Sequence, residues 1–355
     1  MRTRTWRRGT ALIIGSAIGI IGVAAGPATA DGRHPDHQRQ SAFVEDVLVS
    51  DQATPGVPIT DANLINPWGI AFGPTTPLWV ANNGTSTSTL YRTSPPPPAQ
   101  LALVVHTQPA PTGIVFNSST EFKLPDGRHP NFLFDSLSGQ ISAWPAPPET
   151  QTTTMVNIPG AVFTGLALAQ TNHGARLFAA NASSRLVDVF DGNWNLVDVL
   201  RDDHLPQGLT PYNVAVLGGR VYVSYAPPPG VTSSVEGVID VFDLSGRLDR
   251  RLVTGGVLRG PWGMALAPHK WGSFGGALLV GNEDGGAIHA FNPRSGHLLG
   301  TLRDVHGKQI GADGLWGIAF GNGTIGTPND LVIAIGTDGY QHGVVALVRP
   351  APKQE

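Results

Sequence analysis

A short apolar motif recurs six times along the chain, and this recurrence restricts the fold more than any other feature. Each copy begins with glycine, or once with asparagine, and continues with three apolar residues. The copies occupy residues 69–72, 113–116, 165–168, 213–216, 263–266 and 317–320, at spacings of 44, 52, 48, 50 and 54 residues. One four-stranded blade of a β-propeller uses roughly 40–50 residues. The repeat therefore predicts six blades, each starting at one copy of the motif.

Two further sets of short apolar segments follow the motif in a fixed order. We predict second strands at residues 78–81, 132–134, 177–180, 221–224, 278–281 and 332–335. We predict third strands at 89–91, 141–144, 186–190, 238–242, 288–291 and 344–347. In two third strands, Asp188 and Asp240 alternate with apolar residues, a pattern typical of a half-exposed strand.

The fourth strands show how the ring closes. Weaker apolar segments fill five of the six positions, at 101–105, 153–158, 196–200, 248–253 and 298–302. The sixth repeat ends before a fourth strand, whereas an unpaired strand at 43–49 precedes the first motif. Pairing that strand with the last blade removes an open sheet edge. We therefore predict an all-β fold, a six-bladed β-propeller closed by its N-terminal strand; a solenoid is the alternative, but it needs polar capping repeats.

Composition is consistent with a single apolar core. The chain has no cysteine, so neither disulfides nor thiolate metal sites contribute. Its 45 glycines and 30 prolines make about a fifth of 355 residues, below the level of low-complexity chains. Abundant turn formers beside abundant aliphatic residues indicate short strands joined by tight turns.

The first thirty residues have the pattern of an export signal. Four arginines precede an uncharged apolar stretch at 11–26, and small residues at 28–30 resemble a cleavage site. The stretch is shorter than the roughly 20 residues that span a bilayer, so a membrane anchor is the weaker alternative. Paired Arg7 and Arg8 leave twin-arginine export open. We predict a signal peptide at 1–30, a disordered leader at 31–41, one propeller domain at 42–349, a tail at 350–355, and a secreted or cell-envelope location.

The negative net charge of the chain restricts the kinds of partner that it can bind. The whole chain has a formal charge of −3, and without the four arginines of the predicted signal residues 31–355 have 19 basic and 26 acidic residues, a charge of −7. A protein that binds nucleic acid or an anionic membrane needs a basic face. We therefore expect neither partner, and we expect a monomer that binds a small molecule, a glycan or a protein.

Aromatic residues gather where the chain enters the first strands. Loops that enter first strands and loops that join second to third strands lie on one side of a propeller, here called the entry face. Trp68, Trp262 and Trp316 directly precede motif glycines, and Tyr212 precedes the motif asparagine. These rings either pack between blades, where glycine permits close backbone approach, or line a binding site at the channel mouth.

A polar series lies at the ends of the second strands on the same face. Its members are Asn82, Asp135, Asn181, Tyr225, Asn282 and Gly336, with Asn83, Glu283, Asp284, Asp338 and His342 beside them. Asn and Asp are common turn residues, which gives a structural reason for the series. Their oxygens also suit Ca²⁺, so Asn82, Asp135, Asn181 and Asn282 form a candidate metal site.

The opening of the predicted core resembles a known family. Residues 60–71, with Asn66-Pro67-Trp68-Gly69 at their centre, and residues 79–85 are similar to a family of exported, uncharacterised bacterial proteins. The resemblance spans residues 43–348 and implies a propeller and export, but no reaction. More loosely, the blade pattern is similar to six-bladed propellers such as streptogramin lyases and gluconolactonase-type hydrolases, which implies fold alone.

Two functions remain open from the sequence, beside a purely structural role in the cell envelope. The first is an exported binding protein that uses the entry-face residues Trp68, Asn82, Asn83, Asp135, Asn181, Tyr212, Tyr225, Trp262, Asn282, Glu283, Asp284, Trp316 and Asp338. The second is a lyase or lactonase in which Ca²⁺ at the same place polarises a carbonyl or activates water. Neither a nucleophile-elbow motif nor a phosphate-loop motif occurs in the sequence.

Overall fold

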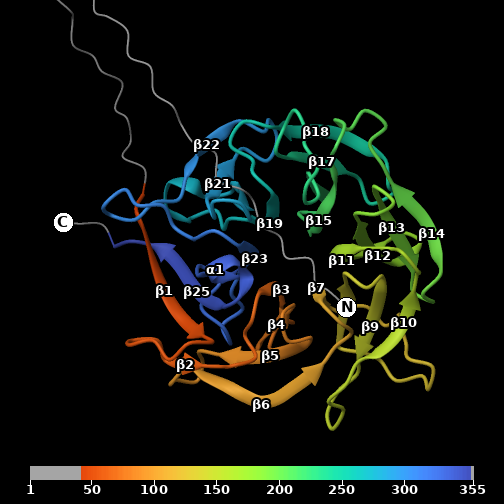
Figure 1. Cartoon of the computed structure of the whole chain (residues 1–355), viewed down its shortest axis with the longest axis horizontal. Coiled ribbons are helices and arrows are strands. Elements are labelled where there is room, and N and C mark those ends of the chain that lie inside the picture. The colour runs from red at the N-terminus through yellow and green to blue at the C-terminus, as the bar shows by residue number, and fades with distance from the viewer. Residues whose placement is uncertain (1–40, 353–355) are drawn as a thin grey trace, which may run out of the picture. The chain divides into compact units, whose positions relative to one another are not determined.

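The protein is a six-bladed β-propeller. A computed structural model describes residues 41–352, so the predicted signal peptide and nearly all of the predicted leader lie outside the described residues. Six antiparallel sheets surround a central axis, and the chain passes from one sheet to the next around the ring (Figure 1). The predicted fold class is confirmed.

Blades 1 to 3 have four strands each, numbered from the axis outward. Blade 1 contains β3 (Pro67–Ala71), β4 (Leu78–Asn82), β5 (Thr87–Arg92) and β6 (Ala99–His106). Blade 2 contains β7 (Pro111–Phe116), β8 (Phe132–Ser136), β9 (Gln140–Trp144) and β10 (Thr153–Asn157). Blade 3 contains β11 (Phe163–Thr171), β12 (Gly174–Asn181), β13 (Leu186–Asp191) and β14 (Leu196–Leu200).

Blades 4 and 5 repeat the pattern, and blade 6 is assembled from both ends of the domain. Blade 4 contains β15 (Thr210–Leu217), β16 (Arg220–Ala226), β17 (Val238–Phe242) and β18 (Leu248–Thr254). Blade 5 contains β19 (Pro261–Leu266), β20 (Leu278–Asn282), β21 (Ile288–Phe291) and β22 (Leu298–Thr301). Blade 6 contains β23 (Leu315–Phe320), β24 (Leu331–Ile335), β25 (Val344–Pro350), β1 (Phe43–Ser50) and β2 (Ile59–Thr60).

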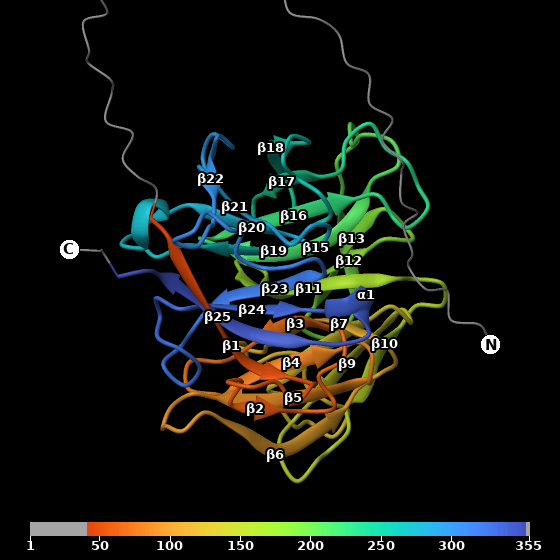
Figure 2. The same cartoon turned by 60° about the vertical axis from the view of Figure 1, so that its left-hand side comes forward.

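The N-terminal strand closes the ring as predicted. Strand β1 pairs antiparallel with β25, from Phe43 opposite Pro350 to Ser50 opposite Val344 (Figure 2). Phe43 is buried and lies against Trp271, with ring centroids 4.7 Å apart. The short parallel strand β2 was not predicted and makes this sheet five-stranded. The closure therefore combines backbone pairing with an aromatic anchor.

The core lies between the blades. Large side chains from facing sheets pack together, for example Trp79 of blade 1 against Phe132 of blade 2, with ring centroids 4.2 Å apart. Outer strands are much more exposed than inner ones, as in β10 and β14. Only short helical turns occur in the described residues, a 3₁₀ turn at Gly272–Phe274 and α1 at Thr337–Tyr340. No helix among them has the length and apolar character that crossing a membrane requires.

The motif glycines have a packing reason. A Cβ on Gly263 would lie 2.4 Å from the carbonyl oxygen of Trp316, in the first strand of the next blade. A Cβ on Gly113 would lie 2.4 Å from the backbone nitrogen of Leu166. Real Cβ atoms do not approach backbone atoms this closely, so first strands of neighbouring blades meet backbone to backbone. The interpretation of these glycines as sites of close approach is confirmed.

The predicted half-exposure of two third-strand aspartates is wrong. Asp188 is 5% exposed and Asp240 is 0% exposed. They pair with Ala179 and Val223 of the second strands, in the layer between two blades. An alternating pattern predicts two different faces, but in a propeller both faces of a blade are covered by neighbours. The acidic positions are therefore buried polar positions.

Candidate functional site

Four aromatic rings meet at the entry-face end of the axis. Trp68, Tyr212, Trp262 and Trp316, here called the aromatic cluster, come from blades 1, 4, 5 and 6. Trp68 stacks on Trp316 with centroids 3.7 Å apart, and Trp262 meets both edge-on at 5.9–6.0 Å. Tyr212 of blade 4 meets Trp316 of blade 6 at 6.0 Å, and Trp262 of blade 5 meets Trp68 of blade 1, so these contacts join blades that are not neighbours around the ring.

The aromatic cluster is covered rather than presented to solvent. Its four side chains are 3–6% exposed. The indole N–H of Trp262 donates to the Thr164 carbonyl at 2.9 Å, and that of Trp316 donates to the Asn66 side-chain oxygen at 3.0 Å. The indole N–H of Trp68 is buried without a hydrogen-bond partner among the described residues. The rings therefore fill this end of the channel and connect blades.

The polar series does not share one register. Asn82, Asn181 and Asn282 pair with the first residues of the facing first strands, and Ser136 holds that place in blade 2. Asp135 is one residue earlier, so its side chain lies on the opposite face of the sheet. The common register expected for Asp135 is therefore wrong.

The members of the series bind partners inside or between blades. The Asn82 amide donates to the Thr89 hydroxyl at 2.9 Å, the Asn181 amide to the Asp188 carboxylate at 2.8 Å, and the Asn282 amide to the Val257 carbonyl at 2.8 Å. Tyr225 is buried beside Asp240, whose charge adds to burial in raising the pKa of the tyrosine hydroxyl. These residues thus bind separate partners in four different blades and do not meet at one point.

Asp135 is a buried carboxylate between blades 2 and 3. Its Oδ1 accepts hydrogen bonds from the Thr112 hydroxyl at 2.8 Å and from the Gly113 backbone N–H at 2.5 Å. Its Oδ2 has no partner among the described residues. Burial raises the pKa of Asp135 to about 6, although these hydrogen bonds oppose the shift. Among the described residues, no three His, Cys, Asp or Glu side chains gather as a metal-binding group.

The remaining predicted residues lie on the entry-face loops. Asn83 donates to the Pro111 carbonyl at 3.1 Å and so joins blade 1 to blade 2. Glu283 accepts a hydrogen bond from the hydroxyl of Tyr340, whose ring lies 5.9 Å from that of Trp316. Asp284 is partly exposed, and Asp338 is exposed on the turn of α1 with a φ of 50°. His342 binds the Asp51 carboxylate at 2.6 Å.

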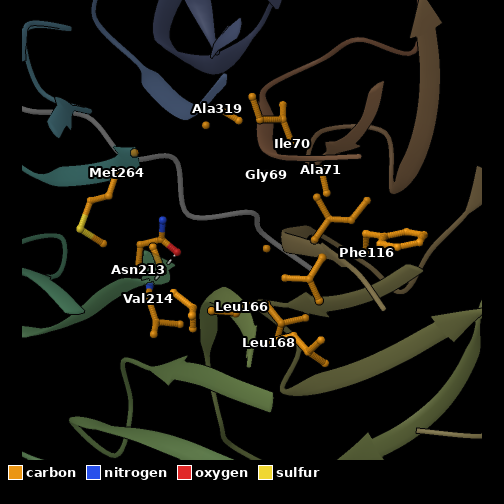
Figure 3. Close-up of a pocket in the computed structure, with 18 of the residues that line it drawn as sticks. Gly69, Ile70, Ala71, Phe116, Leu166, Leu168, Asn213, Val214, Met264 and Ala319 are labelled. Atoms are coloured by element: carbon orange, nitrogen blue, oxygen red, sulfur yellow. Dashed lines mark hydrogen bonds between the residues drawn. The ribbon is translucent and has the colours of Figure 1, made fainter. Parts of the chain in front are cut away.

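A cavity of about 360 Å³ occupies the channel beyond the aromatic cluster (Figure 3). All six first strands line it, and Trp262 borders it toward the entry face. It extends to Phe72, Phe116, Leu168 and Val216, which lie in the later part of the first strands or just past their ends, toward the opposite face. The channel is thus blocked by rings at one end and reaches loops at the other.

The cavity wall is chemically simple. None of the described side chains that line it carries an acid, an imidazole, an amine or a guanidinium. Its side chains are almost all aliphatic, including Ile70, Ile114, Val214, Met264 and Ile318. First strands pair on one side only, so their inner edges also turn backbone N–H and C=O groups toward the axis. The wall can therefore cover the apolar surface of a ligand and form hydrogen bonds with it through backbone groups. It offers no titratable side chain that could act as a general acid or base.

Sequence reasoning missed the cavity and its one polar first-strand side chain, Asn213. The signal was present, because blade 4 carries Asn where the five other copies of the motif carry Gly. Asn213 donates through Nδ2 to the Trp262 carbonyl at 2.8 Å and accepts the Val214 backbone N–H at 2.8 Å. Figure 3 shows it on the cavity wall between Met264 and Val214.

Comparison with solved structures shows the fold. A Kuenenia stuttgartiensis hydrazine synthase chain superposes with a TM-score of 0.53 at 15% identity, over 83% of this chain and 80% of that one. At this identity the likeness extends to architecture alone. No family model matches the sequence.

Two curated relatives come from Acanthamoeba polyphaga mimivirus. "Uncharacterized protein R648" is 32% identical over 284 residues, which cover 73% of this chain and 69% of the relative. "Uncharacterized protein L690" is 31% identical over 282 residues, which cover 73% of this chain and 74% of the relative. The resemblance to an exported bacterial family stays a prediction. On this similarity, the chain belongs to the same protein family as these two mimivirus proteins.

Proposed function

We propose that this propeller is a binding protein that holds a small, uncharged molecule in its central channel. The observation that carries the proposal is the cavity of about 360 Å³, which six first strands line and which the aromatic cluster blocks at one end. Ligand pockets are typically concave, mostly apolar and equipped with a few fixed polar groups, with volumes of roughly 300–1,000 Å³.

The absence of charge on the wall supports an uncharged ligand. An ion that enters such a cavity loses its hydration and finds no opposite charge among the described lining residues. An uncharged molecule loses much less hydration, and the backbone groups of the first strands can replace its hydrogen bonds to water. The same wall gives no support to acid–base catalysis, which requires a titratable group within hydrogen-bond reach of the substrate.

The entry face supports ligand binding less well. The aromatic cluster offers little ring surface, because its rings cover one another. The amide groups already donate hydrogen bonds to partners within the protein in Asn82, Asn181 and Asn282. A glycan or protein partner at Asn83, Asp284 and Asp338 stays a prediction, as does a calcium-assisted reaction at the polar series.

A blocking variant tests the channel site. Cyclohexanol is a suitable uncharged probe, and saturation-transfer NMR reports its binding. Ala319→Phe places a ring in the cavity at a position where blade 2 has the larger Val115. We expect the variant to fold and to lose most of the saturation transfer seen with the wild-type protein.

Matched variants control for the added ring and for the entry face. Ala312→Phe adds the same ring at an exposed loop residue outside the cavity, and Asp338→Asn removes an exposed entry-face charge. Both should bind cyclohexanol like the wild type. Equal binding by Ala319→Phe, or no binding by the wild type at the solubility limit of the probe, would refute the channel site.

Export and a monomeric state complete the proposal. The basic, apolar and small-residue segments of residues 1–30 support export, and they lie outside the described residues. Closure of the ring by β1 supports a monomer, because it pairs the strand edge that blade 6 would otherwise expose.

A further inference from the structure

Asn213 interrupts an otherwise regular position of the six first strands. The five other motif copies carry Gly here, and in each a Cβ would meet atoms of the next blade within 3 Å. Blade 4 accommodates a whole side chain at this position. At this position of the six first strands, Asn213 is therefore the one residue that brings a polar side chain to the cavity.

Two backbone groups fix the orientation of the Asn213 amide. The Trp262 carbonyl only accepts hydrogen bonds, so the atom 2.8 Å from it must be Nδ2. The Val214 N–H only donates, so the atom 2.8 Å from it must be Oδ1. The amide is thus held before any ligand arrives, and a held group loses little freedom on binding.

These two contacts use half of the hydrogen-bonding capacity of the amide. An Asn side chain has two N–H donors and an oxygen with two lone pairs. One N–H and one lone pair are therefore free of partners among the described residues. Asn213 lines the cavity, with its oxygen against Gly165 of blade 3, so a molecule inside the cavity would lie beside this amide.

We infer that Asn213 selects the channel ligand through a hydroxyl or carboxamide group that both donates to and accepts from its amide. This inference rests on the proposed function, because it names the chemical group of the ligand that the same cavity would bind. An acceptor-only group leaves the second lone pair of the Asn213 oxygen unused, and a carboxylate brings a charge that no lining residue neutralises. The ligand class is thus an apolar molecule with an alcohol or amide group.

Three isosteric probes test this selection. Cyclohexanecarboxamide donates and accepts, cyclohexyl methyl ketone only accepts, and cyclohexanecarboxylate is an anion of nearly the same shape. Binding of each is measured by titration with saturation-transfer NMR. We expect the carboxamide to bind about threefold to tenfold more tightly than the ketone, the effect of one hydrogen bond, and the carboxylate to bind most weakly.

Asn213→Gly removes the selecting group and restores the residue that the other blades carry. It should reduce the preference for carboxamide over ketone to about one, while thermal melting shows that the variant is folded. Ser118→Ala removes the other polar side chain of the lining, at the exposed rim, and should preserve the preference.

The outcomes separate the two proposals. If the carboxamide and ketone bind the wild type equally, or if Asn213→Gly keeps the preference, Asn213 does not select the ligand, although the channel site stands. If neither uncharged probe binds, the channel site itself fails. Tightest binding by the carboxylate would overturn both, since the site would then be one for anions.

Discussion

The indole rings of Trp68 and Trp316 stack at a centroid distance of 3.7 Å with an interplanar angle of 16°. They belong to blades 1 and 6, the first and last motif copies in the chain. A further bond joins the same two blades, from the Trp316 indole N–H to the Asn66 side chain. The pair therefore holds together the two ends of the repeat array while it blocks the channel.

Trp316→Ala should destabilise the fold strongly. The substitution removes a buried ring that contacts three other aromatic rings of the cluster, and large-to-small core changes of this kind cost about 3–5 kcal/mol. Chemical denaturation followed by circular dichroism measures the loss. Tyr340→Phe, which keeps its ring and loses only a hydroxyl, should cost far less. A Trp316→Ala protein as stable as the wild type would show that these rings are not packing residues.

Deletion of residues 43–49 should disrupt the ring. The segment forms most of β1, which pairs along the whole of β25, and it carries the buried Phe43. We expect loss of cooperative thermal unfolding, because blade 6 then has an open edge and an emptied aromatic pocket. Deletion of residues 31–40, which precede β1, is the control and should leave the melting temperature nearly unchanged. Similar melting of both deletion proteins would argue against closure by β1.

The architecture was predictable because its signals are local and repeated. The spacing of the motif gives the number of blades, and the unpaired segment at 43–49 identifies the closing strand. Each glycine of the motif reports a close backbone approach, which the sequence can indicate without coordinates. Because the fold uses one structural unit six times, the sequence signals of that unit occur six times along the chain.

The site was less predictable because it depends on how blades face one another. The sequence places Trp68 and Trp316 on the entry face, but whether such rings line a mouth or cover each other depends on distances across the axis. Asp135 shows a second limit. The pairing of the first and second strands is irregular in blade 2, between Pro111 and Ile114. The sequence does not show this irregularity, so it could not indicate that Asp135 lies one residue out of register with the other members of the polar series.

Gly263→Ala should be much more harmful than an ordinary glycine substitution. The new Cβ would lie 2.4 Å from the Trp316 carbonyl oxygen, so blades 5 and 6 must separate or a strand must shift. Overpacking of this kind typically costs about 1–3 kcal/mol, and rigid backbone on both sides favours the upper end. Asn213→Gly, in the adjoining blade, should cost less than Gly263→Ala. The opposite order in urea denaturation would contradict the close approach of first strands.

Asp240 should make the protein less stable as pH rises through neutrality. Burial raises the pKa of Asp240 to about 7 from an ordinary value of 3.8. Arg251 lies 3.5 Å from its carboxylate but also pairs with Asp202, so one cation serves two buried acids. Tyr225 beside it is uncharged. The folded state thus holds a proton that the unfolded state releases, and this stability is present at acid pH and lost as pH rises through about 7.

Asp240→Asn isolates this effect. His289, whose pKa burial lowers to about 4, acts in the opposite direction, because its stability is lost as pH falls from 6.5 toward 4. Both proteins share His289 and Asp135, so their difference reports Asp240. From pH 5 to pH 8 the free energy of unfolding of the wild type should fall by about 3 kcal/mol relative to the variant. Parallel pH profiles would show that Asp240 is already ionised at pH 5.

Methyl NMR tests the channel site most directly. Among the described residues the two methionines are Met264, on the cavity wall, and Met155, on the outer strand β10 of blade 2. With ¹³C-methyl methionine, titration with cyclohexanecarboxamide should shift the Met264 signal in a saturable way and leave the Met155 signal in place. An unmoved Met264 signal, with saturation transfer to the same probe, would place binding outside the channel and contradict the account.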